Sequence, residues 1–190
     1  MNDKKPSSAT EAAEEYDIEL PDNIETEIPK WLSDAIHRGL DRTFKHSYWN
    51  DINRKTSDDL QSLIANGLDN GMSTRELAKA IEAVAPEYST WRAMRVARTE
   101  TTSAMSYAQT EAMKEASAEI GSPIGKEWVS VLGNTTRETH AEADGQIVGV
   151  DEKFTVGGYE CEYPGDPVLP ADERVNCQCG LVSSLIMEDE

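Results

Sequence analysis

Small side chains recur every three or four residues through the middle of the chain. The positions are Ala93, Ala97, Thr101, Ala104, Ala108, Ala112 and Ala116. Residues with this spacing lie above one another on one face of an α-helix. Because small side chains let a second backbone approach closely, the pattern predicts one long helix, over about residues 88–118, that packs tightly against another element.

Shorter helices are predicted before the long one. An apolar stripe covers residues 31–40, and a second helix is predicted from a cap within residues 56–59 to the Asp-Asn-Gly stop at 69–71. Ser73 and Glu76 form a capping box for a third helix, which ends before Pro86. The last two helices resemble a helix-turn-helix. Such hairpins are common in all-helical packing, however, and we do not expect this one to read DNA.

The last third of the chain has a different pattern. It predicts a strand over residues 126–132, then a short helix that carries His140 and is capped by Thr135 or Thr136, then small strands at 154–156 and 181–182. A loop rich in Pro and Gly covers residues 163–170. This third has too little apolar mass to fold alone, so we expect an α+β protein with a helical N-terminal half and a small, loop-rich C-terminal part packed on the long helix.

Charge excludes several classes of function. The 190 residues carry 36 acidic and 18 basic side chains, a net charge of -18. Strong direct binding of DNA is not expected, because nucleic-acid affinity comes mostly from Lys and Arg. Apolar runs are too short to span a bilayer and the start of the chain lacks a secretory pattern, so we expect a soluble protein without a membrane partner. The odd number of cysteines, three, favours a reducing compartment.

The charge also divides the chain. Residues 1–30 hold nine acidic and three basic side chains with few large apolar ones, which predicts an acidic flexible arm; a solvated tail without a role is the other interpretation. We expect a helical partner-binding region over 31–86 and a further unit over 87–190. The acidity either keeps the protein off packaged DNA or reflects a halophilic host.

Three residues of the C-terminal part are candidate metal ligands, namely His140, Cys177 and Cys179. Thiolate and imidazole are good zinc ligands, and Cys161 or Asp144 is the candidate for the fourth. Two other interpretations remain open. The cysteines can be reduced core residues, or a cysteine, a histidine and an aspartate can form a nucleophilic site. We expect the thiol pKa of Cys177 to be raised and not lowered, because its surroundings in the sequence are acidic.

One stretch of the long helix is unusually polar. Residues 98–103, Arg-Thr-Glu-Thr-Thr-Ser, include mediocre helix formers, which is typical of a buried polar network. We expect Glu87 and Glu100 to pair with arginines of the same helix.

The order and spacing of these motifs resemble a known family, the phage Mu F-like head morphogenesis domain. The motifs are Arg98-Thr99-Glu100, Trp128-Val129-Ser130, Thr136-Arg137 with His140, Asp144-Gly145, Phe154, Gly157, Pro164-Gly165-Asp166-Pro167 and Asn176-Cys177 with Cys179. They cover about residues 90–183.

The resemblance implies a minor capsid protein of a tailed virus. Such a protein lies inside the head near the portal, contacts the portal protein and other head proteins, and acts in head morphogenesis, genome packaging or DNA delivery. It is made in the host cytoplasm, and it is not an enzyme. In this interpretation Arg98, Glu100, Trp128, Arg137, Asp144 and Asp166 are structural. Some relatives carry a toxin domain after this module; because only residues 183–190 follow it here, we expect none. The alternative function is a metal-dependent or cysteine hydrolase of head maturation.

Overall fold

The structure is a computed structural model, which describes residues 28–45 and 54–185. Five helices and five strands are placed in those two ranges in addition to a four-residue helix. Their order is α2 Lys30–Phe44, α3 Arg54–Asp69, α4 Thr74–Val84, α5 Thr90–Ile120, β1 Ile124–Val129, α6 Glu138–Ala143, β2 Ile147–Gly149, β3 Phe154–Val156, β4 Tyr159–Cys161, α7 Ala171–Arg174 and β5 Gly180–Leu185. The α+β class is confirmed. The predicted arm over residues 1–30 lies almost wholly outside the described residues.

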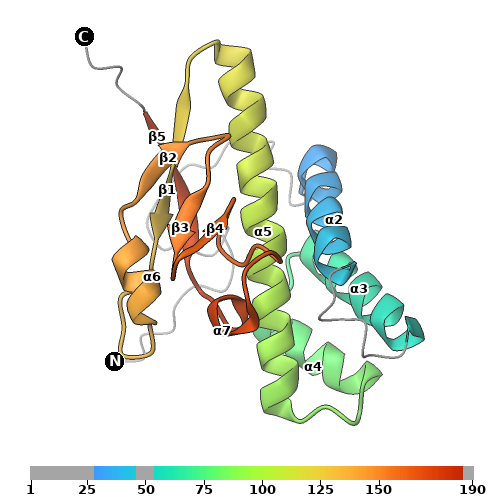
Figure 1. Cartoon of the computed structure of the whole chain (residues 1–190). Coiled ribbons are helices and arrows are strands. Elements are labelled where there is room, and N and C mark those ends of the chain that lie inside the picture. Colours follow the sequence, from blue (N-terminus) through green and yellow to red (C-terminus); the bar gives the residue numbers. More distant parts are fainter. Residues whose placement is uncertain (1–27, 46–53, 186–190) are drawn as a thin grey trace, which may run out of the picture.

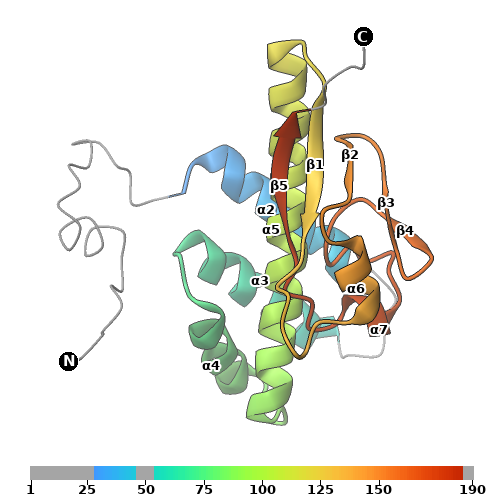
Figure 2. The same ribbon diagram turned by 90° about the vertical axis from the view of Figure 1, so that its left-hand side faces the viewer.

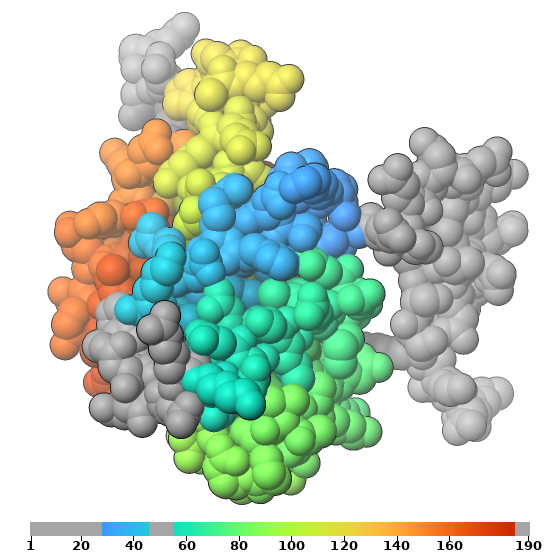
Figure 3. Space-filling model, turned by 90° about the vertical axis from the view of Figure 1, so that its right-hand side faces the viewer, coloured from blue at the N-terminus to red at the C-terminus, as the bar shows by residue number. Residues whose placement is uncertain are grey.

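The long helix α5 is the centre of the fold, with α2, α3 and α4 on one side and the strands, together with α6 and α7, on the other (Figure 1). It begins after Ser89, whose hydroxyl accepts a hydrogen bond from the Arg92 amide, and ends at Gly121, whose φ is 68°. Its predicted bounds therefore hold to within two residues. In Figure 3, α2, α3 and α4 (blue to green) cover much of the face that is seen, with the end of α5 (yellow) and part of the C-terminal half (orange) beside them.

The small face of α5 contacts α2 as the spacing predicts. Ala93, Ala97, Ala104 and Ala108 are fully buried in the first apolar core, together with side chains of α2, α3 and α4. At the closest point a Cβ added to Gly39 of α2 would lie 3.1 Å from the Ala104 Cα. Because one residue has no side chain and the other only a methyl group, the backbones of the two helices approach closely at this point.

The short helices follow their sequence signals with two differences. The capping box of Ser73 and Glu76 is present, and Gly71 ends the turn after α3 with a φ of 67°. However, α3 already begins at Arg54, ahead of the predicted cap. At the end of α4, Val84 is 42% exposed, although the apolar pattern of this helix predicts that Val84 faces the core.

The C-terminal half forms two small antiparallel sheets and a second core. Strand β1 lies between β2 and β5, and β3 pairs with β4. Inward side chains of these strands form the second apolar core together with residues of α6 and of the loops, and this core contacts Tyr107 and Met113 of α5. Figure 2 shows β5 and β1 running alongside α5. The predicted packing on the long helix is therefore correct.

Two predictions for this half are wrong in detail. Strand β1 ends at Val129, and Val131 and Leu132 are more than 60% exposed, because the chain turns away from the sheet. Neither Thr135 nor Thr136 caps α6, whose N-cap is Arg137. The Thr136 hydroxyl instead donates to the Val131 carbonyl and accepts from the Gly133 amide, closing the turn between β1 and α6. In the described part of the chain, no helix is both long and apolar enough to cross a bilayer.

Candidate functional site

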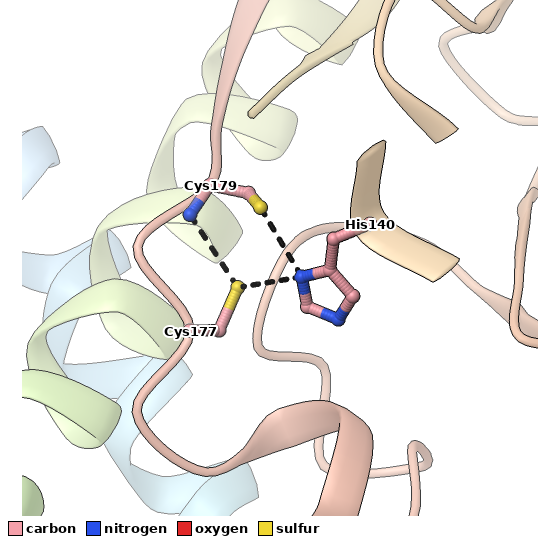
Figure 4. Close-up of side chains that lie close together, drawn as sticks. All are labelled: His140, Cys177 and Cys179. Carbon is pink, nitrogen blue, oxygen red and sulfur yellow. Dashed lines mark hydrogen bonds between the residues drawn. The ribbon is translucent and has the colours of Figure 1, made fainter. Parts of the chain in front are cut away.

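His140, Cys177 and Cys179 meet at one point, although they come from two segments of the chain. His140 lies on α6, and the cysteines lie on the loop from α7 to β5 (Figure 4). The His140 Nδ1 atom is 3.2 Å from the Cys179 Sγ and 3.7 Å from the Cys177 Sγ. The candidate ligand atoms of all three residues lie within 4.8 Å of one another, and all three side chains are buried.

The end of β1 holds α6, and with it His140, in place. The Ser130 amide donates to Asp144 at 2.6 Å, and the Ser130 hydroxyl donates to the His140 carbonyl at the same distance. The indole N–H of Trp128 donates to the Ser130 hydroxyl, and the Trp128 ring packs edge-on against the His140 ring. Trp128 therefore contacts the imidazole directly, and Asp144 binds Ser130, whose hydroxyl binds the His140 carbonyl.

The polar stretch of α5 holds the cysteine loop. The hydroxyl of Thr99 accepts a hydrogen bond from the Asn176 amide, and the hydroxyl of Thr102 donates to the Cys177 carbonyl, both at 2.9 Å. Asn176 has a φ of 62°, in the left-handed region that asparagine tolerates. The unusual threonines of this helix thus form the polar network that the sequence suggested, and they fix the backbone next to Cys177.

A buried ion pair holds α7 against α5. Two oxygens of Glu100 accept from Arg174 at 2.9 and 3.1 Å, and both side chains are at most 3% exposed. The predicted pairing of Glu100 within its own helix is therefore wrong. Arg98 instead donates to the Asn176 side chain across the loop, and Arg137 donates to the Val175 carbonyl. These two arginines therefore connect the cysteine loop to α5 and to the start of α6.

The second ring nitrogen of His140 faces a carboxylate. His140 Nε2 lies 3.1 Å from Glu173 Oε2, within ion-pair distance but at an angle that leaves this buried nitrogen without a hydrogen bond. The Thr139 hydroxyl donates to the same oxygen at 2.8 Å. A carboxylate behind the imidazole is the usual neighbour of a histidine that ligates a metal through its other nitrogen.

The two thiols interact, and their pKa values shift in opposite directions. The Cys177 thiol donates toward the Cys179 sulfur, which raises the pKa of Cys177 and lowers the pKa of Cys179. Contacts with His140 and Ser130 lower the pKa of Cys179 further, against the effect of burial. The expected rise in the pKa of Cys177 is thus confirmed, although its largest cause is the contact with Cys179 and not the acidic flanking sequence. The lowered pKa of Cys179 depends on contacts within the site and was not predicted.

The donor set fits a tetrahedral zinc ion. Ordinary Zn–S and Zn–N bond lengths place a nitrogen and a sulfur about 3.6 Å apart around the metal, and two sulfurs about 3.8 Å apart. The two observed N–S distances, 3.2 and 3.7 Å, lie on either side of that value. Small side-chain movements would therefore accommodate an ion between Nδ1 and the two sulfurs.

Neither predicted fourth ligand joins this cluster among the described residues. Cys161 is fully buried in the second core, where burial raises the pKa of its thiol to about 12. Asp144 accepts the Ser130 amide, and Asp166 accepts the Glu162 and Val168 amides within the Pro-rich loop. The Cys-His-Asp arrangement that the sequence left open is not formed with an aspartate, because the carboxylate next to His140 belongs to Glu173.

The three donors line a pocket that is open to solvent. Its walls also include Val131, Thr136, Arg137, Asn176 and Gln178. The cluster is thus buried at its sides but accessible from the pocket.

Sequence reasoning did not identify Glu173 as part of the site. Its helix, α7, has four residues, too few for a periodic pattern, and the contact with His140 joins positions 33 residues apart in the chain. The available signal was local: Pro170 precedes two acidic residues and an arginine, as at a helix start.

Comparison with known proteins identifies a family whose matched region contains the candidate site. Residues 58–182 match the model of the family described as "Phage Mu protein F like protein". The chain is 30% identical over 167 residues to the uncharacterized protein YqbB of Bacillus subtilis, covering 85% of this chain and 53% of that protein. It is 33% identical over 168 residues to the NAD(+)--arginine ADP-ribosyltransferase EFV of Enterococcus faecalis, covering 86% of this chain and 34% of that protein. No solved structure gives a significant match.

Proposed function

Because the chain belongs to the family of phage Mu protein F-like proteins, we propose that it is a minor head protein of a tailed virus, bound near the portal inside the head. The observation that carries this proposal is the family match, which extends from α3 into β5 and includes His140, Cys177 and Cys179. The chain spans about half of one relative and a third of the other. The transferase activity named for the Enterococcus protein is therefore not transferred to this chain.

The helical half is the proposed partner-binding region. Trp31 of α2 and Trp91 of α5 are 51% and 68% exposed, and the Arg95 guanidinium lies over the Trp91 ring. Exposed tryptophan and arginine are enriched among the residues that dominate protein interfaces. The portal protein is the proposed partner, and the net charge of -18 favours a protein partner over packaged DNA.

The test is the copy number of the chain in purified heads of its own virus, measured by quantitative mass spectrometry relative to the portal protein. We expect a few copies per head, and a large decrease when Trp31 and Trp91 are both replaced by Ala. The control is Tyr159→Ala, which removes an aromatic ring of similar exposure, 49%, from the β3–β4 hairpin. Absence of the wild-type chain from heads would contradict the proposal.

The same proposal includes a structural zinc ion at His140, Cys177 and Cys179. The ion would join α6 to the loop before β5 in a half of the chain whose apolar core is small. Metal-binding free energy then adds to the stability of this half. The Glu173 carboxylate supports this assignment, because it would accept the Nε2 proton of a histidine that binds metal through Nδ1.

A cysteine hydrolase of head maturation is the second candidate. The line from Cys179 Sγ through both nitrogens of His140 to Glu173 favours it, as does the lowered pKa of Cys179. In this alternative Cys179→Ser gives stable, fully incorporated protein in heads that do not mature. In the structural proposal the same substitution lowers stability and incorporation together, and no processing step is lost separately.

A further inference from the structure

We propose that the zinc site keeps its fourth coordination position open toward the pocket, and that this position takes the carboxylate of another molecule, with Arg137 as its charge partner. This inference rests on the zinc site proposed above.

The described residues bring three candidate ligands together, one fewer than zinc has in its usual tetrahedral sites. Glu173 is held on the far side of the imidazole, at Nε2, and by the Thr139 hydroxyl. Its carboxylate is therefore placed to orient His140, on the side away from the sulfurs.

The cluster is accessible from solvent on one side, because all three candidate ligands line the solvent-open pocket. The other directions are filled, because the Trp128 ring packs on His140 and α5 holds the cysteine loop through Thr99 and Thr102. An incoming ligand therefore reaches the metal from the pocket.

The charge of the pocket wall decides which fourth ligand is favoured, because a zinc ion with two thiolates and a neutral imidazole has no net charge. Residues 126–190 contain four basic side chains. Lys126 is buried and donates to the Glu162 carbonyl, Lys153 pairs with Glu160, and Arg174 pairs with Glu100. Arg137 lines the pocket, where its guanidinium also donates to the Val175 carbonyl but is paired with no carboxylate among the described residues. A basic side chain at this position in an otherwise acidic half favours an anion.

A carboxylate is the anion that the pocket favours. Carboxylate oxygens are ordinary zinc ligands, and the guanidinium group binds carboxylates with two parallel hydrogen bonds. Asn176 adds an amide to the pocket wall, and its side-chain oxygen accepts from Arg98 at 2.8 Å, which fixes the orientation of that amide. Val131, 63% exposed at the same pocket, offers an apolar contact to the carbon atoms next to the carboxylate.

The test uses the full chain with Co²⁺ in place of zinc, because the visible absorption of Co²⁺ reports its ligands. Acetate is titrated at constant ionic strength, with chloride as the comparison, and the titration is repeated with a short peptide that carries one glutamate. We expect a saturable change in the cobalt bands with both carboxylates. Tighter binding of the peptide assigns the ligand to a protein, and equal binding assigns it to a small molecule.

The variant Arg137→Gln should weaken acetate binding about tenfold, since it removes a hydrogen bond to a charged group. Lys153→Gln is the matched control, with the same change of charge on a side chain that pairs with Glu160 outside the pocket, and it should leave the affinity unchanged. Arg137→Lys keeps the charge and should give an intermediate affinity, which covers the case in which the glutamine variant does not fold.

Two results would overturn the inference in different ways. Cobalt bands that do not respond to either carboxylate would mean that the fourth ligand comes from the chain itself, while the zinc site would stand. A chain that binds no cobalt would remove the zinc site and this inference together, while the head-protein proposal, tested by copy number, would be unaffected.

Discussion

At the scale of single residues, the pair of Glu100 and Arg174 has the clearest energetic consequences. Burial raises the pKa of Glu100 to about 7, although Arg174 opposes the shift. An acid whose pKa is higher in the folded state contributes stability below its unfolded pKa, near 4.5, and loses it as the pH rises through 7. The arginine limits that loss.

We predict that Arg174→Met destabilises the protein by about 3–5 kcal/mol near neutral pH, because it leaves a buried carboxylate without its partner. The variant loses the interaction that lowers the pKa of Glu100, so its deficit should be larger at pH 8 than at pH 5. Chemical unfolding at the two pH values measures the difference. Lys153→Met, at a largely exposed pair, should change stability by less than about 1 kcal/mol at both. A deficit that grows toward acid pH would contradict this account of Glu100.

Gly165 in the Pro-rich loop approaches α5 more closely than a side chain allows. Its φ is 79°, and an added Cβ would lie 3.1 Å from the backbone nitrogen of Ser103. Gly158 has a similar φ, 83°, with open space around it. We expect Gly165→Ala to cost about 1–3 kcal/mol more than Gly158→Ala, because both pay for the left-handed backbone and one also overpacks a helix. Thermal unfolding of the two variants compares them, and equal melting temperatures would mean that the loop moves away freely.

At the scale of elements, the small face of α5 sets how closely the helices pack. Ala104 is fully buried against Gly39 of α2. We predict that Ala104→Leu destabilises the chain by at least about 1–3 kcal/mol, the usual cost of overpacking, and that Gln109→Leu on the exposed face of the same helix has little effect. Urea unfolding of both variants checks the prediction. Similar midpoints would mean that α2 can shift on α5 without loss.

The elements that the sequence predicted best are those with many repeats of a pattern. The alanine spacing predicted α5 and its buried face, and the capping box predicted the start of α4. Strands β2 and β4 have three residues each and α7 has four, and they were not predicted. Strand β3 is equally short and was predicted at its observed bounds, because Phe154 and Val156 alternate with a polar residue. The cap of α6 was assigned to the wrong residue because Thr136 closes a turn with Val131 and Gly133, a use of threonine that resembles a cap in sequence.

For the candidate site, the sequence identified residues with suitable chemistry, but it did not show which of them lie close together in the fold. His140, Cys177 and Cys179 were identified because imidazole and thiolate are zinc ligands, and the structure brings them together. Glu173 was missed, and Asp144 and Cys161 were included, because only the fold shows which carboxylate or thiol lies near the ring. The pKa of Cys179 depends on contacts between segments that are 39 residues apart in the chain.

At the scale of the whole molecule, α5 contributes to both cores, and it joins the helical half to the sheet half. The division into a partner-binding region over 31–86 and a unit over 87–190 remains a prediction. In our account the helical half contacts the portal, while the metal cluster holds the last strand on the body. Loss of the cluster should therefore loosen the C-terminal half first.

Metal content and amide exchange of the purified full-length chain test this account most directly. We predict one zinc ion per chain, absent in Cys177→Ser, and faster exchange over residues 138–143 and 175–181 when a chelator removes it, while α2, α3 and α4 keep their protection. Asp172→Asn, an exposed substitution on α7, is the control and should keep its zinc. A wild-type chain without zinc, with a Cys177→Ser variant equally protected over both segments, would contradict the central claim.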